Sequence, residues 1–337
     1  MNRSIRKIAG KNEFYVLITI VVLCIVIGLI NNAFLTLSSA FDIIRSGIEM
    51  GIFAVGAYIV IVSGGIDVSC TAVGTFAMFT TTKILYDSKY EGGILLALVM
   101  AVGFGLILGI LNGTLIAYLK IPPLIATLAT GGIINGFMLF FIGSREISNV
   151  PKGIYNAGKS MLAVVENEHG FKSALPSTLL ILIGVLIVTF FIMRYTMLGR
   201  GIFAIGGDMI SAQRAGFNIK RTQMFIYAYV GIISGLAGMV HTIMMINSNP
   251  LDLSGKEMMV IAAVVIGGAR ITGGHGSLTG TMLGVSLVTI MSNSLILIGI
   301  PSFWQRFVTG LIILIGTGIT AYQAKRMKKQ LNVEVAD

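Results

Sequence analysis

The sequence predicts an all-α, polytopic membrane protein with about ten transmembrane helices and both termini in the cytoplasm. Of its 337 residues, 55% are hydrophobic and only 11% are charged. Soluble domains carry about 25% charged residues, more than twice that share. Apolar runs near the roughly 20 residues that cross a bilayer recur along the chain. Inside a bilayer a helix satisfies its own backbone hydrogen bonds, which makes helices the natural spanning elements here.

A basic segment, residues 1–12, precedes the first expected span, 14–30. This apolar run is longer than that of a secretory signal, so we expect an uncleaved span. The basic residues before it favour a cytoplasmic N-terminus, because Lys and Arg are enriched on that side. The further expected spans are 41–62, 69–86, 93–119, 124–142, 176–193, 223–245, a short 258–268, 278–298 and 303–322.

The segments between the spans complete a single transmembrane domain, residues 1–337. The nearly neutral loop 144–175 is expected outside the cell, whereas 195–221 and the basic tail 323–337 are expected in the cytoplasm. Most Lys and Arg then lie inside, as the positive-inside rule requires. The net charge of +10 therefore reflects topology and contact with anionic lipid rather than nucleic-acid binding.

Glycine is abundant, with 42 residues, and this favours close helix packing in the membrane. Gly105, Gly109 and Gly113 recur at every fourth position and predict a packing face of small residues.

Charged groups inside the expected spans are few. Asp42, Arg45 and Glu49 lie at helical spacing in the second span, where we expect them to pair with one another near the outer surface. His241 is expected to be a packing histidine, with a group of the solute pathway as the alternative. So few intramembrane acids disfavour a carrier driven by protons or sodium ions.

The polar stretch LGRGIFAIGGDMISAQRAGFNIKR, residues 198–221, separates two apolar runs. Asp208 can cap a short helix and Gly216 can end it. Met209, Ala212 and Ala215 recur every third residue and predict an apolar stripe on that helix. Two turns are too few to be stable alone in water, so we expect the helix to dock into another protein. A connector lying on the membrane surface is the alternative.

Two glycine pairs interrupt apolar runs in a similar setting. Glu49-Met50 leads to Gly64-Gly65, and Glu257-Met258 leads to Gly267-Gly268. Paired interruptions of this kind can mark the pathway of a transporter, although two ordinary turns would give the same pattern. Asp67 can either cap the following helix or serve as an ion site. The pathway and helix-break candidates are Gly64, Gly65, Asp67, Ser69, Asn112, Thr127, Gly267, Gly268 and Asn293.

The sequence contains no GxxxxGK[ST] phosphate loop, so we expect no ATP hydrolysis by this chain. It also lacks HExxH, a metal-spaced Cys/His set and a GxSxG elbow, and we expect neither a metal site nor enzyme activity.

Four ordered motifs resemble the membrane permeases of ribose-type ABC importers. They are SGGIDVS at 63–69, LIATLAT at 124–130, GRGIFAIGGDMISAQRAGFNIKR at 199–221 and IAAVVIGGARITGGHGSLTGTMLG at 261–284. The resemblance extends from about residue 45 to the end of the chain. Cys70-Thr71 departs from the small residues and glycine that often follow the first motif.

The resemblance implies a subunit of the plasma or inner cell membrane that binds no cofactor itself. Its partners would be two ATPase subunits that use ATP-Mg, an external solute-binding protein and a second permease copy. The solute would be small and uncharged, a monosaccharide first, with nucleosides, autoinducer-like compounds and polyols as alternatives. A secondary carrier and a passive channel or scaffold are the other classes considered. The implied ATPase-coupling residues are Gly199, Arg200, Gly206, Gly207, Asp208, Ala212, Arg214 and Gly216.

Overall fold

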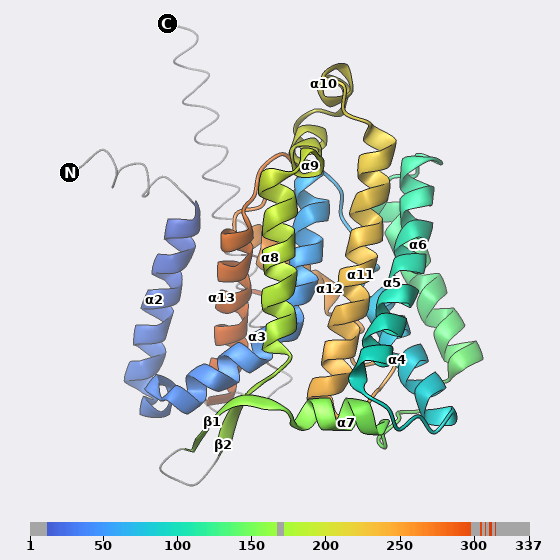
Figure 1. Ribbon diagram of the computed structural model, residues 1–337. Helices are drawn as coiled ribbons and strands as arrows, with labels where there is room; N and C mark the ends of the chain where they lie inside the picture. Colours follow the sequence, from blue (N-terminus) through green and yellow to red (C-terminus); the bar gives the residue numbers. More distant parts are fainter. Residues whose placement is uncertain are drawn as a thin grey trace, which may run out of the picture.

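The computed structural model describes residues 12–166 and 172–297, together with Trp304, Phe307, Gly310, Leu311 and Leu314. Within this part the chain forms a helical bundle (Figure 1). The predicted N-terminal segment 1–12, except Asn12, and the predicted tail 323–337 lie outside the described residues. So does most of the tenth expected span, 303–322.

The described helices lie close to the expected spans. In chain order they are α2 (Asn12–Ile30), η1 (Asn32–Leu35), α3 (Leu37–Val62), α4 (Cys70–Asp87), α5 (Ile94–Ala117), α6 (Pro123–Phe137), η2 (Met138–Ile142), α7 (Lys152–Lys159), α8 (Leu179–Tyr195), α9 (Met197–Gly207), α10 (Met209–Arg214), α11 (Ile219–Met245), α12 (Glu257–Ile266) and α13 (Leu278–Leu297). Six are long and apolar enough to cross a membrane, or seven if α8 and α9, bent by 73°, form one span. These helices confirm a polytopic helical membrane protein. The count of about ten spans stays a prediction.

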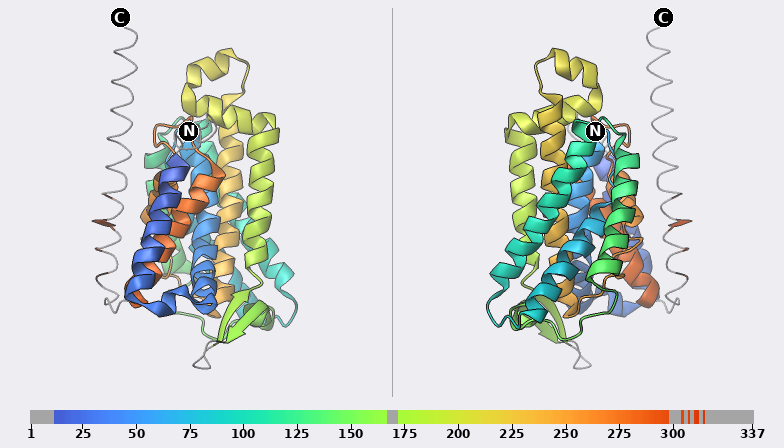
Figure 2. Two further views of the ribbon diagram at one scale, coloured as in Figure 1. Left: turned by 90° about the vertical axis from the view of Figure 1, so that its left-hand side faces the viewer. Right: turned by 90° about the vertical axis from the view of Figure 1, so that its right-hand side faces the viewer.

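The two ends of the bundle differ (Figures 1 and 2). Helices α9 and α10 lie at one end, which we call the coupling end. Helix α7 and strands β1 (Met161–Glu166) and β2 (Lys172–Pro176) lie at the other, which we call the hairpin end. The described parts of the predicted loop 144–175 contain regular structure: β1 and β2 pair antiparallel, and a bridge joins Ile147 to Ser248. The fold is all-α apart from these short strands.

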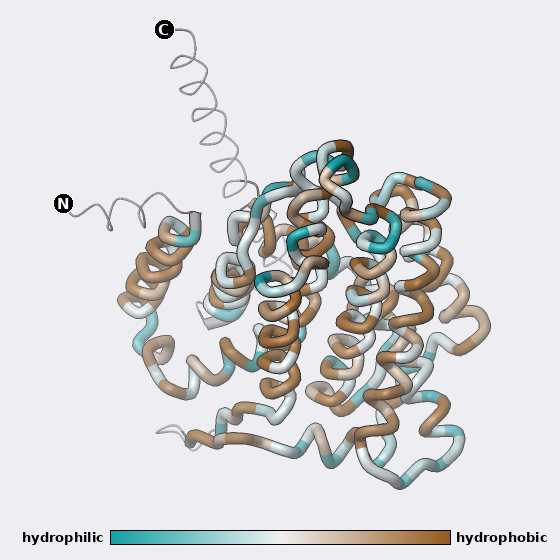
Figure 3. Tube along the Cα trace, turned by 45° about the horizontal axis from the view of Figure 1, so that its top comes forward, coloured by the Kyte–Doolittle hydropathy of each residue, from teal (hydrophilic) through white to brown (hydrophobic). Residues whose placement is uncertain are grey.

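Helices α3 and α11 form the core. The α3 residues from Gly51 to Val62 are all buried, as expected for an apolar helix in the centre of a bundle. Helix α11 packs against α3, α4 and α5. Large apolar side chains on the outer helices are exposed, as lipid contact requires, and hydrophobic residues run along the helices of the bundle (Figure 3).

The packing of α5 on α11 confirms the predicted small-residue face. A Cβ atom on Gly105 would lie 2.2 Å from the carbonyl oxygen of Gly231. One on Gly109 would lie 2.4 Å from the carbonyl oxygen of Tyr227. Only glycine at these positions lets the two backbones approach so closely.

Helix α12 is unusually short. Its 10 residues rise about 15 Å, roughly half of the 30 Å hydrocarbon core. It is preceded by a loop, residues 246–256, that follows the end of α11 at the hairpin end (Figure 1). We call residues 246–256 the re-entrant segment. Irregular backbone at membrane depth requires cover by protein or water.

Candidate functional site

Glycines from three segments of the chain meet at the coupling end. The amide of Gly274 donates to the carbonyl of Val62 at 2.8 Å. A Cβ atom on Gly206 would lie 1.8 Å from that same carbonyl oxygen, and one on Gly273 would lie 2.8 Å from Cα of Gly64. We call this contact the glycine junction: Val62, Gly64, Gly206, Gly273 and Gly274. It joins the end of α9 directly to the end of α3 and to the loop after α12.

The predicted coupling residues fall into two groups. Gly199, Gly206 and Ala212 are buried, whereas Arg200, Gly207, Asp208, Arg214 and Gly216 are exposed. The buried Gly199 lies at the bend between α8 and α9, where a Cβ atom would lie 2.4 Å from the carbonyl oxygen of Met193. The sequence did not indicate α9 as a separate helix, because its bend depends on that close packing.

Helix α10 begins and ends as predicted. The carboxylate of Asp208 accepts a hydrogen bond from the Ser211 amide at 2.6 Å. Hydrogen bonds from the side chain and backbone of Ser211 lower the pKa of Asp208. Gly216 takes a left-handed conformation with φ of +89° just after the helix. Of the predicted apolar stripe, Ala212 is buried within the chain, while Met209 and Ala215 are exposed, so the docking of this stripe on a partner stays a prediction.

A groove of about 710 Å³ lies beside α10. Its walls come from two segments: the turn from α5 to α6, and the chain from α10 to the start of α11. Gln213 and Phe217 line one wall, while Lys120 and the Pro122-Pro123 pair line the other.

Four pathway candidates come together in the break between α3 and α4. The Asp67 carboxylate accepts from the amide and the hydroxyl of Ser69, both at 2.7 Å. The Asn112 amide donates to the Ser69 hydroxyl at 2.9 Å, and the Thr127 hydroxyl accepts from the Val68 amide at 3.3 Å. All four side chains are buried. Asp67 thus supports the start of α4, which agrees with the helix-capping role, one of the two roles predicted for it.

The second glycine break, which follows α12, has different contacts. Gly267 packs against α13, where an added Cβ atom would lie 2.2 Å from the carbonyl oxygen of Gly280. Gly268 has φ of +98°. Asn293 lies apart from both breaks: its amide donates to the Thr289 carbonyl at 2.9 Å and its carbonyl oxygen accepts from the Ser46 hydroxyl at 3.4 Å.

Replacing Gly268 with Leu is expected to abolish transport while leaving expression largely intact. A β-carbon in the left-handed region costs roughly 1–2 kcal/mol, which reshapes the turn after α12 without unfolding the bundle. Uptake and the amount of protein in the membrane are the measurements. Gly184→Leu, on the outer side of α8 with nothing within 4 Å, is the matched control. Wild-type uptake by Gly268→Leu would contradict the role of this turn.

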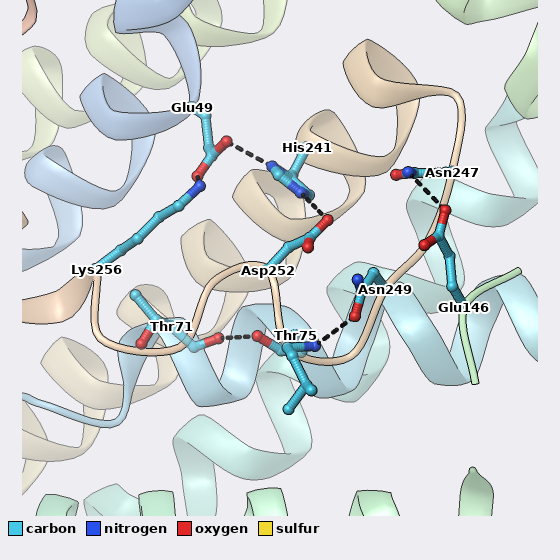
Figure 4. A network of polar contacts seen from close by, with 10 residues as sticks. Glu49, Thr71, Thr75, Glu146, His241, Asn247, Asn249, Asp252 and Lys256 are labelled. Carbon is cyan, nitrogen blue, oxygen red and sulfur yellow. Dashed lines mark hydrogen bonds and ion pairs between the residues drawn. The ribbon is translucent and has the colours of Figure 1, made fainter. Parts of the chain in front are cut away.

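A polar network that the sequence did not reveal joins α3, α11 and the re-entrant segment (Figure 4). His241 Nδ1 lies 2.6 Å from Glu49 Oε2, and its Nε2 lies 3.3 Å from Asp252 Oδ2. The Lys256 ammonium lies 3.1 Å from Glu49 Oε1. We call these four residues the Glu49 network.

The Glu49 network corrects one expectation and agrees with another. Glu49 pairs with His241 and Lys256 rather than with Asp42 or Arg45. Asp42 instead accepts a hydrogen bond from the Ser173 hydroxyl at 3.2 Å. His241 is buried and both of its ring nitrogens have carboxylate partners, as expected for a satisfied packing histidine.

A smaller cavity of about 160 Å³ lies between the start of α4, the middle of α6 and the junction of the re-entrant segment with α12. Next to it the Thr71 hydroxyl donates to Glu257 Oε2 at 2.9 Å. We call this the Glu257 cavity. Its polar lining residues are Thr71, Thr75, Thr127, Asn135, Ser254 and Glu257.

The comparisons with known proteins now decide the class. The family described as the permease component of branched-chain amino acid transport systems matches residues 39–316. The chain belongs to this family.

This permease has full-length relatives. It is 31% identical to the probable ABC transporter permease protein YphD of Escherichia coli K12, over 94% of this chain and 92% of the relative. It is 30% identical to the ribose import permease protein RbsC of Bacillus subtilis 168, over 87% and 88%. It is 27% identical to the autoinducer 2 import system permease protein LsrC of Yersinia pseudotuberculosis, over 91% and 84%. No solved structure matches it.

The family and the apolar helices agree on a multi-pass membrane protein. It is the permease subunit of an ABC importer and not an enzyme, since ATP hydrolysis in such importers occurs in a separate subunit.

Proposed function

We propose that this permease carries a small uncharged, hydroxylated solute, a monosaccharide, across the plasma or inner membrane of the cell. The names of its relatives support a sugar, since three of them are ribose import permeases from different organisms. The hydroxyl and amide groups of the Glu257 cavity support the same class. An autoinducer-like solute is the second candidate, favoured by the similarity to the autoinducer 2 import permease.

We further propose that α10 docks on an ATPase and that the coupling end faces the cytoplasm. Exposed apolar side chains of Met209 and Ile210 beside the basic Arg214 support a protein-binding surface. The groove next to α10 adds room for a partner.

The glycine junction is the observation that carries the coupling proposal. It places α9 against the end of α3 without an intervening side chain, so a displacement of α10 reaches the helix breaks through backbone contact. Two ATPases that use ATP-Mg, an external binding protein and a second permease copy complete the proposed importer. Work then enters from the ATPases, which fits a chain with few charged groups in its spans.

The solute proposal is tested by uptake into vesicles that contain the permease, its ATPase and its binding protein. We expect labelled ribose or a related monosaccharide to accumulate only when ATP is present. Accumulation driven by a proton or sodium gradient without the ATPase would contradict the proposal and favour a secondary carrier. Uptake of an autoinducer-like compound with no competition from monosaccharides would favour the second candidate.

Asp208→Lys is expected to uncouple transport. The substitution removes the acceptor for the Ser211 amide and places a cation at the positive end of α10. Binding of the ATPase and ATP-driven uptake should both fall. Asp208→Asn keeps an N-cap acceptor and is the matched control, expected to retain most activity.

The same carboxylate gives the coupling helix a pH dependence with a defined sign. Because the pKa of Asp208 is lowered in the folded chain, its contribution is present above the unfolded pKa and is lost as pH falls through the folded value. Wild-type ATPase binding should therefore weaken at acidic pH more than binding by Asp208→Asn. Equal pH profiles would show that the cap has no role in docking.

A further inference from the structure

The Glu257 cavity has the features of a binding site, and nothing in the transport cycle described so far assigns it a ligand. We propose that it is a subsite for a neutral polyhydroxylated solute, in which Glu257 accepts hydroxyl hydrogens and repels anions. This inference rests on the proposed function as a solute importer, and it adds the contacting residue and the charge selectivity.

Three polar groups in the cavity remain available to a solute. Within the described part of the chain, the side chains of Asn135 and Ser254 have no hydrogen-bond partner, and Glu257 uses only Oε2, which accepts from Thr71. The free groups comprise an amide, a hydroxyl and a carboxylate oxygen. Together they can donate to and accept from adjacent hydroxyls, which are both donors and acceptors.

The position of Glu257 is fixed from the neighbouring residues. Lys256 pairs with Glu49 of α3, and Asp252 contacts His241 of α11. Thr71, which is 3% exposed, holds Oε2 from the side of α4. Contacts with α3 and α11 therefore hold the chain next to Glu257, and Thr71 of α4 holds the carboxylate itself, so little conformational freedom has to be lost when a solute binds.

The cavity cannot face lipid. Met258 beside Glu257 is 57% exposed, and Ser254 and Gly255 are exposed as well. A carboxylate and irregular backbone open to hydrocarbon would be very unfavourable, so this face requires water or another protein.

The charge of the cavity gives it selectivity. Glu257 is the only ionisable residue among those that line it, and none of the lining residues is Lys, Arg or His. An anionic solute would meet the unbalanced negative charge of Glu257, whereas a neutral hydroxylated solute would donate a hydrogen bond to it. The subsite should therefore reject phosphorylated and carboxylated sugars.

The first test measures access to the cavity and its charge. Met258→Cys is placed in a background with Cys24→Ala and Cys70→Ala, and Ile187→Cys, which is exposed on α8, is the control for lipid contact. In the reconstituted importer we expect a cationic methanethiosulfonate reagent to modify Met258→Cys faster than an anionic one. Adding Glu257→Gln should remove that preference. The inference would be overturned if Met258→Cys reacted as slowly as Ile187→Cys. It would also be overturned if Glu257→Gln left the charge preference of the reaction unchanged.

The second test measures transport. Glu257→Gln is expected to lower kcat/KM for monosaccharide uptake about tenfold, the loss expected when a hydrogen bond to a charged group becomes a neutral one. Glu146→Gln, whose carboxylate binds Asn247 in an exposed contact, should leave uptake unchanged. Wild-type uptake by Glu257→Gln would overturn the subsite.

The two proposals can fail separately. If the wild-type importer does not carry a monosaccharide, the proposed function fails, whatever the reactivity of Met258→Cys. If it does carry one while Glu257→Gln is silent in both tests, only the subsite fails.

Discussion

Gly206→Ala is expected to eliminate coupled uptake. The added Cβ atom would lie 1.8 Å from the Val62 carbonyl oxygen and 2.6 Å from the Gly274 amide nitrogen. Both are backbone atoms, so no rotamer change relieves the clash and α9 must separate from α3 and from the loop after α12. Overpacking of this kind costs about 3 kcal/mol, which corresponds to roughly a hundredfold loss in the population of the native junction.

The measurement is ATP-driven uptake together with the ATPase activity of the assembled importer. Uptake should fall below detection while ATP hydrolysis loses its response to the binding protein. Gly207→Ala is the matched control, because a Cβ atom there has nothing within 4 Å. Coupled uptake by Gly206→Ala at the level of Gly207→Ala would show that the glycine junction does not transmit motion from α10.

Glu49→Ala is expected to lower the stability of the permease by about 3 kcal/mol, the lower part of the range for breaking a buried ion pair. A value at the lower end of that range is expected because the Lys256 side chain is 42% exposed, so water partly compensates for the lost ion pair. His241, which is buried, loses its partner at 2.6 Å at the same time. The re-entrant segment then loses its attachment to α3, so uptake should fall as well.

Thermal unfolding in detergent measures this effect. Glu49→Gln, which keeps the shape and a hydrogen-bond acceptor but not the charge, should lie between Glu49→Ala and the wild type. Asp42→Ala on the same helix is the control, since that side chain is exposed and accepts a single hydroxyl. Its effect should stay within about 0.5 kcal/mol, as for most surface substitutions. Equal unfolding temperatures for Glu49→Ala and Asp42→Ala would mean that the Glu49 network contributes no stability.

Local signals made much of this fold predictable. The cap at Asp208 and the left-handed turn at Gly216 depend only on nearby backbone, and both are found where expected. The spacing of Gly105 and Gly109 likewise identified a helix-packing face, because the period of a helix is known in advance. The apolar runs likewise gave the positions of most described long helices, because the length needed to cross a bilayer is known in advance.

Features that depend on distant residues were not predictable in this way. Glu49 and His241 are 192 positions apart, and only the packing of α3 on α11 brings them together. The sequence instead suggested Asp42 and Arg45 as partners of Glu49, because they are its near neighbours in the chain, and this prediction was wrong. The apolar stripe on α10 stays a prediction, because within the chain only Ala212 of this six-residue helix is buried and a partner would have to cover the rest.

The short α12 has a consequence for how the chain enters the bilayer during synthesis. Helix α12 has only ten residues, the first of which is Glu257, and Lys256 precedes it. It forms a weak insertion signal, because a full span needs about 20 residues and charged residues disfavour insertion. The favourable partners of this segment, Glu49 and His241, belong to helices made earlier. We therefore expect the insertion of α12 to depend on α3 and α11, which hold the segment directly before it.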